Sequence, residues 1–161
     1  MQRLLIITLT LLLSIASEAQ TDEVTSTINN WHKAAEEADF KAYFDLMTTD
    51  AVFVGSDASE VWNYKAFKAF SKPYFETGKA WTFVPVNRNI YVNDKKDMAW
   101  FDEVLTSDHM GLCRGSGVLI KEKGKWKIQH YVLSLAVPNA LVDELVSEKS
   151  KLDKEYLESH P

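Results

Sequence analysis

Cysteine is nearly absent from the sequence, which has only Cys113 among its 161 residues. A single cysteine cannot form an intramolecular disulfide, so packing must hold the fold together. The four histidines show neither an HxH nor an HExxH spacing, and we expect no metal site and no cofactor. A phosphate-binding glycine loop is missing as well, because Gly111, Gly115 and Gly117 lie on or beside an expected strand.

Clusters of lysine and arginine are also missing, and the formal net charge is −5. A mildly acidic chain without a basic patch is poorly suited to bind nucleic acid or an anionic membrane surface. Aromatic residues are plentiful by contrast, with five Trp, six Tyr and eight Phe. These large side chains can supply the core that disulfides do not.

The longest apolar run, residues 4–13, has about half the length that a membrane-spanning helix needs. Arg3 precedes this run, and Ser17 and Ala19 place small residues three before and one before Gln20. This layout predicts a cleaved signal peptide at residues 1–19 and a secreted or periplasmic protein without membrane association after cleavage. The alternative is an apolar N-terminal helix of a cytosolic protein.

The rest of the chain, about 140 residues, is long enough for one domain with its own core. Helical periodicity comes first, and strand periodicity follows after Gly78. We predict helices at 22–38, from 40 to 47 and through 67–74, strands at 50–54, 81–92 and 98–106, and two more strands within 112–135. The predicted fold is α+β, with N-terminal helices packed on a curved, mostly antiparallel sheet at 20–138, and a charged C-terminal helix at 139–161 that frays after Leu152.

The two last strands determine which polar side chains share a face. Glu122-Lys123-Gly124 suits a three-residue hairpin loop, which would set Ser116 opposite His130 and Arg114 opposite Val132. Paired residues share a face, and the apolar residues on this one indicate that it packs under the helices. We therefore expect Arg114, Ser116 and His130 to point inward.

A buried guanidinium requires a partner, because a lone buried charge costs several kcal/mol. The strand at 98–106 offers Asp102 and Glu103, only one of which can point inward. We favour Asp102, which shares the parity of Trp100 and Val104. The cluster is either a small-molecule pocket or a plain internal ion pair beside a hydrogen-bonded histidine.

The sequences ADFKAYFDLMTTDAVFVGSDASEVW, AWFDEVL and RGSGVLIKEKGKWKIQHYVLS resemble the SnoaL-like branch of the nuclear transport factor 2-like superfamily. The resemblance covers roughly residues 22–138. It implies a cone-shaped fold with a cavity between the helices and the concave sheet, and a homodimer formed through the outer face of the sheet. Tyr131, Leu133 and Leu135 are expected on that outer face, unless the C-terminal helix covers them.

Ketosteroid isomerase, an enzyme with this fold, uses an Asp base, a Tyr donor and a protonated Asp. By ungapped counting from residues 50–51, the donor position falls on Trp31 and the base position on Gly55, which cannot accept a proton. That mechanism is therefore not expected. Polyketide-cyclase chemistry also needs an acid/base pair, for which Asp102 and His130 are candidates.

The resulting hypothesis is an exported domain that binds a small, partly apolar molecule. Arg114 would anchor an anionic or carbonyl group beside Ser116, with Asp102 and His130 orienting it. Three aromatic residues are expected to contact the body of the ligand: Trp31, Tyr43 and Trp62. The alternatives are an isomerase, cyclase or hydrolase that uses Asp102 and His130 as acid and base, and a dimeric interaction module without a ligand.

Overall fold

The computed structural model describes residues 2–160, with side chains from residue 19 onward. The predicted signal peptide at residues 1–19 therefore lies, except for residue 19, outside the residues whose side chains are described. The helices are α1 (Gln2–Glu36), α2 (Phe40–Asp45), α3 (Tyr64–Glu76), the short 3-10 helix η1 (Asn139–Leu141) and α4 (Val142–Ser159). The strands are β1 (Met47–Val54), β2 (Val61–Asn63), β3 (Val84–Val92), β4 (Met98–Ser107), β5 (Gly111–Glu122) and β6 (Lys125–Leu135). In the described part of the chain, no helix is both long and apolar enough to cross a membrane.

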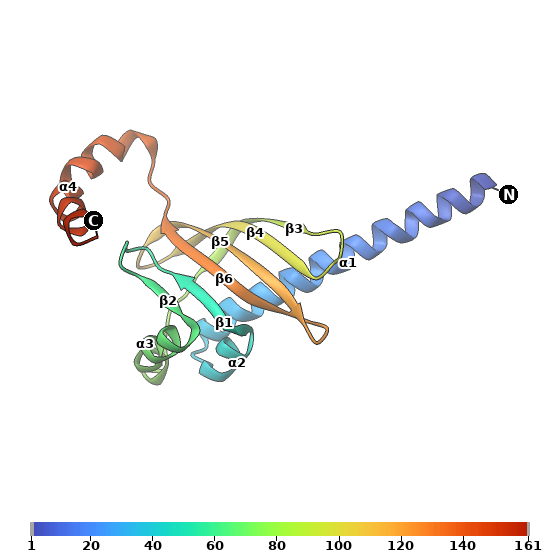
Figure 1. The fold of residues 1–161 in the computed structure, drawn as a ribbon, viewed down its shortest axis with the longest axis horizontal. Coiled ribbons are helices and arrows are strands. Elements are labelled where there is room, and N and C mark those ends of the chain that lie inside the picture. Colours follow the sequence, from blue (N-terminus) through green and yellow to red (C-terminus); the bar gives the residue numbers. More distant parts are fainter. Residues whose placement is uncertain (1, 161) are drawn as a thin grey trace.

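The six strands form one sheet in the order β2-β1-β6-β5-β4-β3. Every neighbouring pair is antiparallel except β1 and β6. Helices α1, α2 and α3 lie on one side of this sheet, and α4 stands apart at the end where β6 leaves it (Figure 1). The predicted α+β architecture is confirmed.

The core is a cluster of contacting aromatic rings between the helices and the sheet. Phe53 of β1 stacks on Phe67 of α3 with 4.0 Å between ring centroids, and Trp31 of α1 stacks on Tyr43 of α2 at 4.8 Å. The two shorter helices begin at side-chain caps that satisfy a free backbone N–H. The Asp39 carboxylate accepts from the Ala42 amide at 2.9 Å, and the side-chain oxygen of Asn63 does the same for the Ala66 amide.

The β5–β6 hairpin turns through two residues, not the predicted three. Lys123 and Gly124 have φ values of 50° and 81°, and Glu122 pairs with Lys125. Two consecutive residues with positive φ are typical of a type I′ turn, whose twist matches that of the flanking strands. This shifts the predicted register by one residue, so the β5 residues that were expected on the inner face lie on the outer face.

A second irregularity in the strand pairing changes which residues of β6 face the helices. Leu119 pairs with Ile128 but Val118 pairs with His130, which leaves Gln129 as an extra residue between them. Arg114, Ser116 and His130 do share one face, as predicted, but it is the outer face of the sheet. The inner face instead carries the buried residues Cys113, Leu119, Trp126, Ile128, Tyr131 and Leu133. The predicted outward orientation of Tyr131, Leu133 and Leu135 is therefore wrong, although Leu135, which pairs with Cys113 at the end of β6, is exposed.

Helix α4 has no buried residue, although it continues past Leu152 to Ser159. Its exposed apolar residues include Leu145, Val146 and Leu152. Near its end, the Tyr156 hydroxyl donates a hydrogen bond to the Ala58 carbonyl at 3.1 Å. Residue 58 lies in the loop between β1 and β2, so the last turns of α4 lie beside that loop, beyond the end of the sheet (Figure 1).

Candidate functional site

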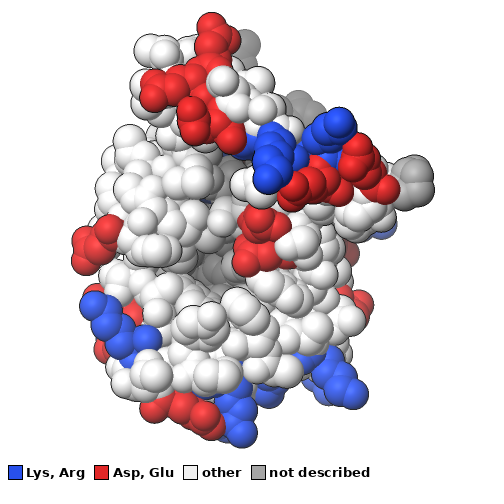
Figure 2. Space-filling view, turned by 90° about the vertical axis from the view of Figure 1, so that its left-hand side faces the viewer, with Lys and Arg blue, Asp and Glu red and all other residues white. Residues whose placement is uncertain are grey.

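A cavity of about 410 Å³ opens at the end of the sheet where β1, β4 and β6 finish. Strand β1, β2, helix α3, the segment before β3 and the β4–β5 turn all contribute to it. Seven aromatic residues line it: Phe53, Trp62, Phe67, Phe70, Tyr74, Trp81 and Phe83. Figure 2 looks onto this end of the molecule and shows a hollow bordered mostly by uncharged residues, with acidic side chains at one edge.

Four titratable side chains also line the cavity, namely Glu60, Lys79, Asp108 and His109. Glu60 is partly buried, whereas the other three are exposed. The Glu60 carboxylate lies against Gly55, and a Cβ atom at residue 55 would overlap it and come within 2.9 Å of the Glu60 Cβ. The absence of a side chain at residue 55 therefore leaves the space that the Glu60 carboxylate occupies on the cavity wall.

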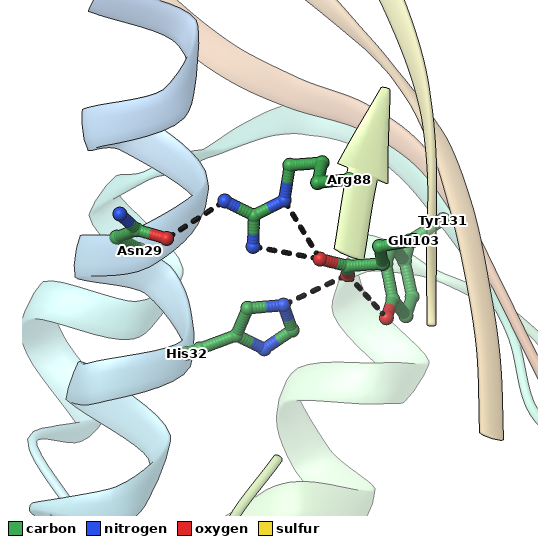
Figure 3. Close-up of polar contacts among 5 residues, drawn as sticks. All are labelled: Asn29, His32, Arg88, Glu103 and Tyr131. Carbon is green, nitrogen blue, oxygen red and sulfur yellow. Dashed lines mark hydrogen bonds and ion pairs between the residues drawn. The ribbon is translucent and has the colours of Figure 1, made fainter. Parts of the chain in front are cut away.

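A second polar group lies deeper, on the inner face of β4, and is centred on Glu103 (Figure 3). The carboxylate oxygen Oε1 is 2.9 Å from Nε2 of His32 and accepts from the Tyr131 hydroxyl at 3.0 Å. The guanidinium of Arg88 donates to the other oxygen through Nε at 2.8 Å and Nη2 at 2.7 Å. Its remaining Nη1 donates to Asn29 of α1 at 2.7 Å.

The carboxylate at the centre of this Glu103 cluster is isolated from water, so both of its oxygens need hydrogen-bond partners. The side chain of Glu103 has 0% exposure, that of His32 has 7% and that of Arg88 has 9%. Burial alone would raise the pKa of Glu103, but the hydrogen bond from His32 and the charge of Arg88 outweigh it and lower that pKa. Burial and the adjacent carboxylate raise the pKa of Tyr131 well above its usual value, so the phenol stays protonated.

The cluster and the cavity are separated by one layer of rings. Phe83 lines the cavity and lies 6.4 Å from the His32 ring, and Phe53 lines it and lies 5.6 Å from the Tyr131 ring. None of the residues bonded in the cluster lines the cavity itself. The cluster therefore joins α1 to strands β3, β4 and β6, and thereby fixes the floor of the cavity.

The four polar residues predicted to line the pocket lie on the outer face, away from the cavity. Asp102 accepts a hydrogen bond from the side chain of Asn89 at 3.0 Å. Arg114 is exposed, and Ser116 and His130 are partly buried. Among the described residues, no hydrogen bond or ion pair joins Arg114 to Asp102. The predicted inward orientation is wrong for three reasons. The two-residue turn reverses the face of Arg114 and Ser116, and the extra residue Gln129 reverses that of His130. Asp102 lies on the same face as the exposed Trp100, opposite to the buried Phe101 and Leu105.

The three predicted aromatic residues divide between the wall and the layer behind it. Trp62 lines the cavity, whereas Trp31 and Tyr43 are buried behind Phe53 and Phe67. Trp31 Nε1 and the Tyr43 hydroxyl have no hydrogen-bond partner within the described structure. Burial raises the pKa of Tyr43 well above its usual value.

Sequence reasoning missed both Glu103 and Glu60. Glu103 alternates with the apolar residues Phe101 and Leu105, just as Asp102 alternates with Trp100 and Val104. The sequence therefore does not show which of the two faces is buried. Glu60 lies in a loop, where no periodicity indicates a direction. Within the described residues, no group of three His, Cys, Asp or Glu side chains is arranged to hold a metal ion.

Solved structures of the NTF2-like class share this fold. An NTF2-like protein of unknown function from Pseudomonas putida aligns with TM-score 0.63 and 14% identity over 76% of this chain and 90% of that one. A proposed NTF2-like dehydratase from Streptomyces avermitilis gives 0.66 and 14% over 76% and 99%. The association domain of C. elegans CaMKII gives 0.60 and 18% over 74% and 98%. At these identities the likeness establishes the fold.

The family is identified by the sequence itself. The model of the SnoaL-like domain matches residues 24–138, so the chain belongs to that family. No curated protein matches the chain. The matched segment begins in α1 and ends just after β6, so it contains the cavity and the Glu103 cluster but not α4.

Proposed function

We propose that this chain is an exported SnoaL-like domain that binds a small, partly apolar molecule in the cavity beside α3. The observation that supports the proposal most directly is the cavity itself. Its volume of about 410 Å³ falls in the range of small-molecule sites, which are mostly apolar and aromatic with a few convergent polar groups. The cavity has seven aromatic rings and only a few charged groups on its wall, which matches that composition.

Native mass spectrometry of the protein purified from its own source tests this proposal, because a retained ligand appears as an added mass. Ala80 lines the cavity and is partly buried, so Ala80→Trp should fill the space and remove the added mass. Ala69→Trp is the matched control, since Ala69 is exposed on α3 and does not line the cavity. An added mass that persists in folded Ala80→Trp would place the ligand elsewhere.

Export is part of the proposal, and contacts near the expected cleavage point support it. Lys121 Nζ donates to the Gln20 side-chain oxygen at 2.9 Å and to Glu23 at 3.0 Å, so the predicted mature N-terminus already packs on the domain. Trp126 Nε1 also donates to Glu23, at 3.2 Å. The intact mass of the secreted protein should correspond to a chain that begins at Gln20. Recovery of a chain beginning at Met1 would contradict export by cleavage.

We also propose that two copies associate through the outer face of the sheet. The rings of Tyr91 and Trp100 stack there with 5.7 Å between centroids and remain 46% and 44% exposed, and Met98, on the same face of β4, is 40% exposed. An exposed apolar patch of this kind is typical of a protein interface. Sedimentation analysis should show a dimer that Trp100→Glu converts to a monomer. A dimer without any bound ligand would instead favour the interaction-module alternative.

The enzyme alternative keeps one supporting observation, although Asp102 and His130 point away from the cavity. The Glu60 carboxylate fills the space next to Gly55, where counting placed the ketosteroid-isomerase base. A carboxylate at this point is positioned to exchange a proton with a bound molecule. Once a retained ligand is identified, its C–H groups can be followed by NMR in D₂O. Deuterium exchange that wild type catalyses and Glu60→Gln does not would establish the activity.

A further inference from the structure

The charged groups of the cavity differ in burial, and the least exposed of them is an anion. Glu60 is partly buried, whereas Lys79, Asp108 and His109 are exposed. Within the described structure, the Glu60 side chain makes one long hydrogen bond, from the Asp57 amide at 3.3 Å, and no ion pair. A partly buried carboxylate that lacks a cation is a favourable site for one.

Four of the aromatic residues that line the cavity with Glu60 are arranged in a contacting row. Trp62 stacks on Phe70 with 4.6 Å between ring centroids. The centroid distance is 5.3 Å from Phe70 to Tyr74 and 6.4 Å from Tyr74 to Trp81. All four line the cavity, and Phe70 and Tyr74 remain 40% and 47% exposed. The faces of such rings attract cations through their quadrupoles, and tryptophan does so most strongly.

The wall of the cavity offers few cationic partners to an anionic ligand. Arg114, the residue expected to anchor an anionic group, lies on the outer face of the sheet, and Arg88 is already paired with Glu103. Lys79 is the one lysine or arginine among the described lining residues, and its exposed position leaves it in contact with water. Among the described residues, the cavity wall therefore lacks the buried cation that was expected to anchor an anionic group.

We propose that the cavity selects an organic cation, an amine or quaternary ammonium group carried on an apolar body. The Glu60 carboxylate faces the positive charge, and the row from Trp62 to Trp81 holds the charged group and the body. This inference rests on the proposed binding function and specifies the class of ligand. Gly55 is essential to it, because any side chain there would displace the carboxylate.

Three probes of similar size separate the effect of charge from that of shape. Phenyltrimethylammonium is the cation, tert-butylbenzene is its neutral isostere and benzoate is an anion. Binding to the protein expressed from the full chain can be measured by calorimetry and by fluorescence of Trp62 and Trp81. We expect the cation to bind about tenfold more tightly than the neutral isostere, the size of a partly desolvated cation–π and carboxylate contact.

Two variants at the site and one distant control test the residue assignment. Glu60→Gln should weaken cation binding about tenfold and leave the affinity for tert-butylbenzene unchanged. Gly55→Ala should have a similar effect, since it moves the same carboxylate without removing it. Asp94→Asn removes one exposed negative charge from the β3–β4 turn and should leave the affinities for all three probes unchanged. Thermal unfolding of each variant confirms that it is folded.

The outcomes distinguish this inference from the proposed function. If tert-butylbenzene or benzoate binds as tightly as the cation, the cavity is a binding site and the charge preference is wrong. Equal cation affinity for wild type and Glu60→Gln would also overturn the assignment. If no probe binds, the inference fails as well, and the native mass measurement decides separately whether the cavity holds a ligand.

Discussion

Asp102 and Glu103 are neighbours on β4, yet they experience opposite environments. Asp102 lies on the outer face and accepts a hydrogen bond from Asn89. Glu103 lies on the inner face with no exposure and interacts with His32, Arg88 and Tyr131. A step of one residue along a strand therefore separates an ordinary surface carboxylate from the centre of a buried cluster.

The difference shows what determines the direction of a charged residue in this sheet. Burial of an isolated carboxylate costs far more than any one hydrogen bond returns. Glu103 can be buried because Arg88 approaches from β3, His32 from α1 and Tyr131 from β6. Each partner comes from a different element, so the cluster forms only when the whole domain folds.

The largest expected effect comes from removing the charge of Glu103. Glu103→Gln keeps the shape of the side chain but leaves the nearly buried Arg88 without its counterion, which should lower the free energy of unfolding by about 3–5 kcal/mol. Asp102→Asn is the matched change on the outer face and should cost less than about 0.5 kcal/mol. Urea denaturation of both variants measures the difference. Equal losses at the two positions would mean that the cluster contributes no more than the surface carboxylate does.

A smaller effect is expected from Gly115, which lies on β5 opposite Glu103. A Cβ atom there would overlap the Tyr131 hydroxyl and come within 2.9 Å of Glu103 Oε1. Gly115→Ala should therefore cost about 1–3 kcal/mol by overpacking. Tyr131→Phe removes the overlapping oxygen together with its hydrogen bond to Glu103, which is worth about 1.5–3 kcal/mol.

The double variant sharpens this prediction. Because Tyr131→Phe opens space for the new methyl group, Gly115→Ala should cost less in that background than in wild type. Chemical denaturation of the two single variants and the double variant gives the coupling energy. Strictly additive losses would show that the hydroxyl does not restrict residue 115.

The pH dependence of stability provides a third comparison. The pKa of Glu103 is lowered from 4.5 in the folded state, so the unfolded state binds more protons as the pH falls. The stability that Glu103 contributes is complete above the unfolded pKa and is lost as the pH falls through the lower folded pKa. Glu103→Gln should therefore lose less stability than wild type when the pH is lowered from neutral to below 4.5. If the free energy of unfolding fell by the same amount in both proteins over this pH range, the prediction would be contradicted.

The fold was predictable from the sequence because helical and strand periodicities persist over long segments and leave little choice of element. Orientation was less predictable, since it depends on a single residue at the hairpin. Lys123 adopts a positive φ that lysine rarely takes, so the three letters Glu-Lys-Gly favoured a longer loop. The extra residue Gln129 in β6 likewise carries no sequence signature.

The cavity was only partly predictable for a related reason. Trp62 was expected on its wall and lies there, because a large aromatic residue after a loop tends to pack. Glu60 could not have been assigned, since its position depends on the loop folding back onto Gly55. Glu103 and Asp102 offered equally good alternations, so only the three-dimensional register decides between them.

The smallest effects are expected on the outer face, at the residues that the sequence had placed in the pocket. Arg114→Met should change the free energy of unfolding by less than about 0.5 kcal/mol, because the exposed guanidinium keeps its hydration in both states. It should also leave the affinity for a cavity ligand unchanged, since the side chain lies across the sheet from the cavity. Calorimetry with any ligand that Ala80→Trp excludes checks this directly. A clear loss of that affinity in folded Arg114→Met would mean that the guanidinium reaches the cavity and that the register of β5 described above is not the one the protein uses.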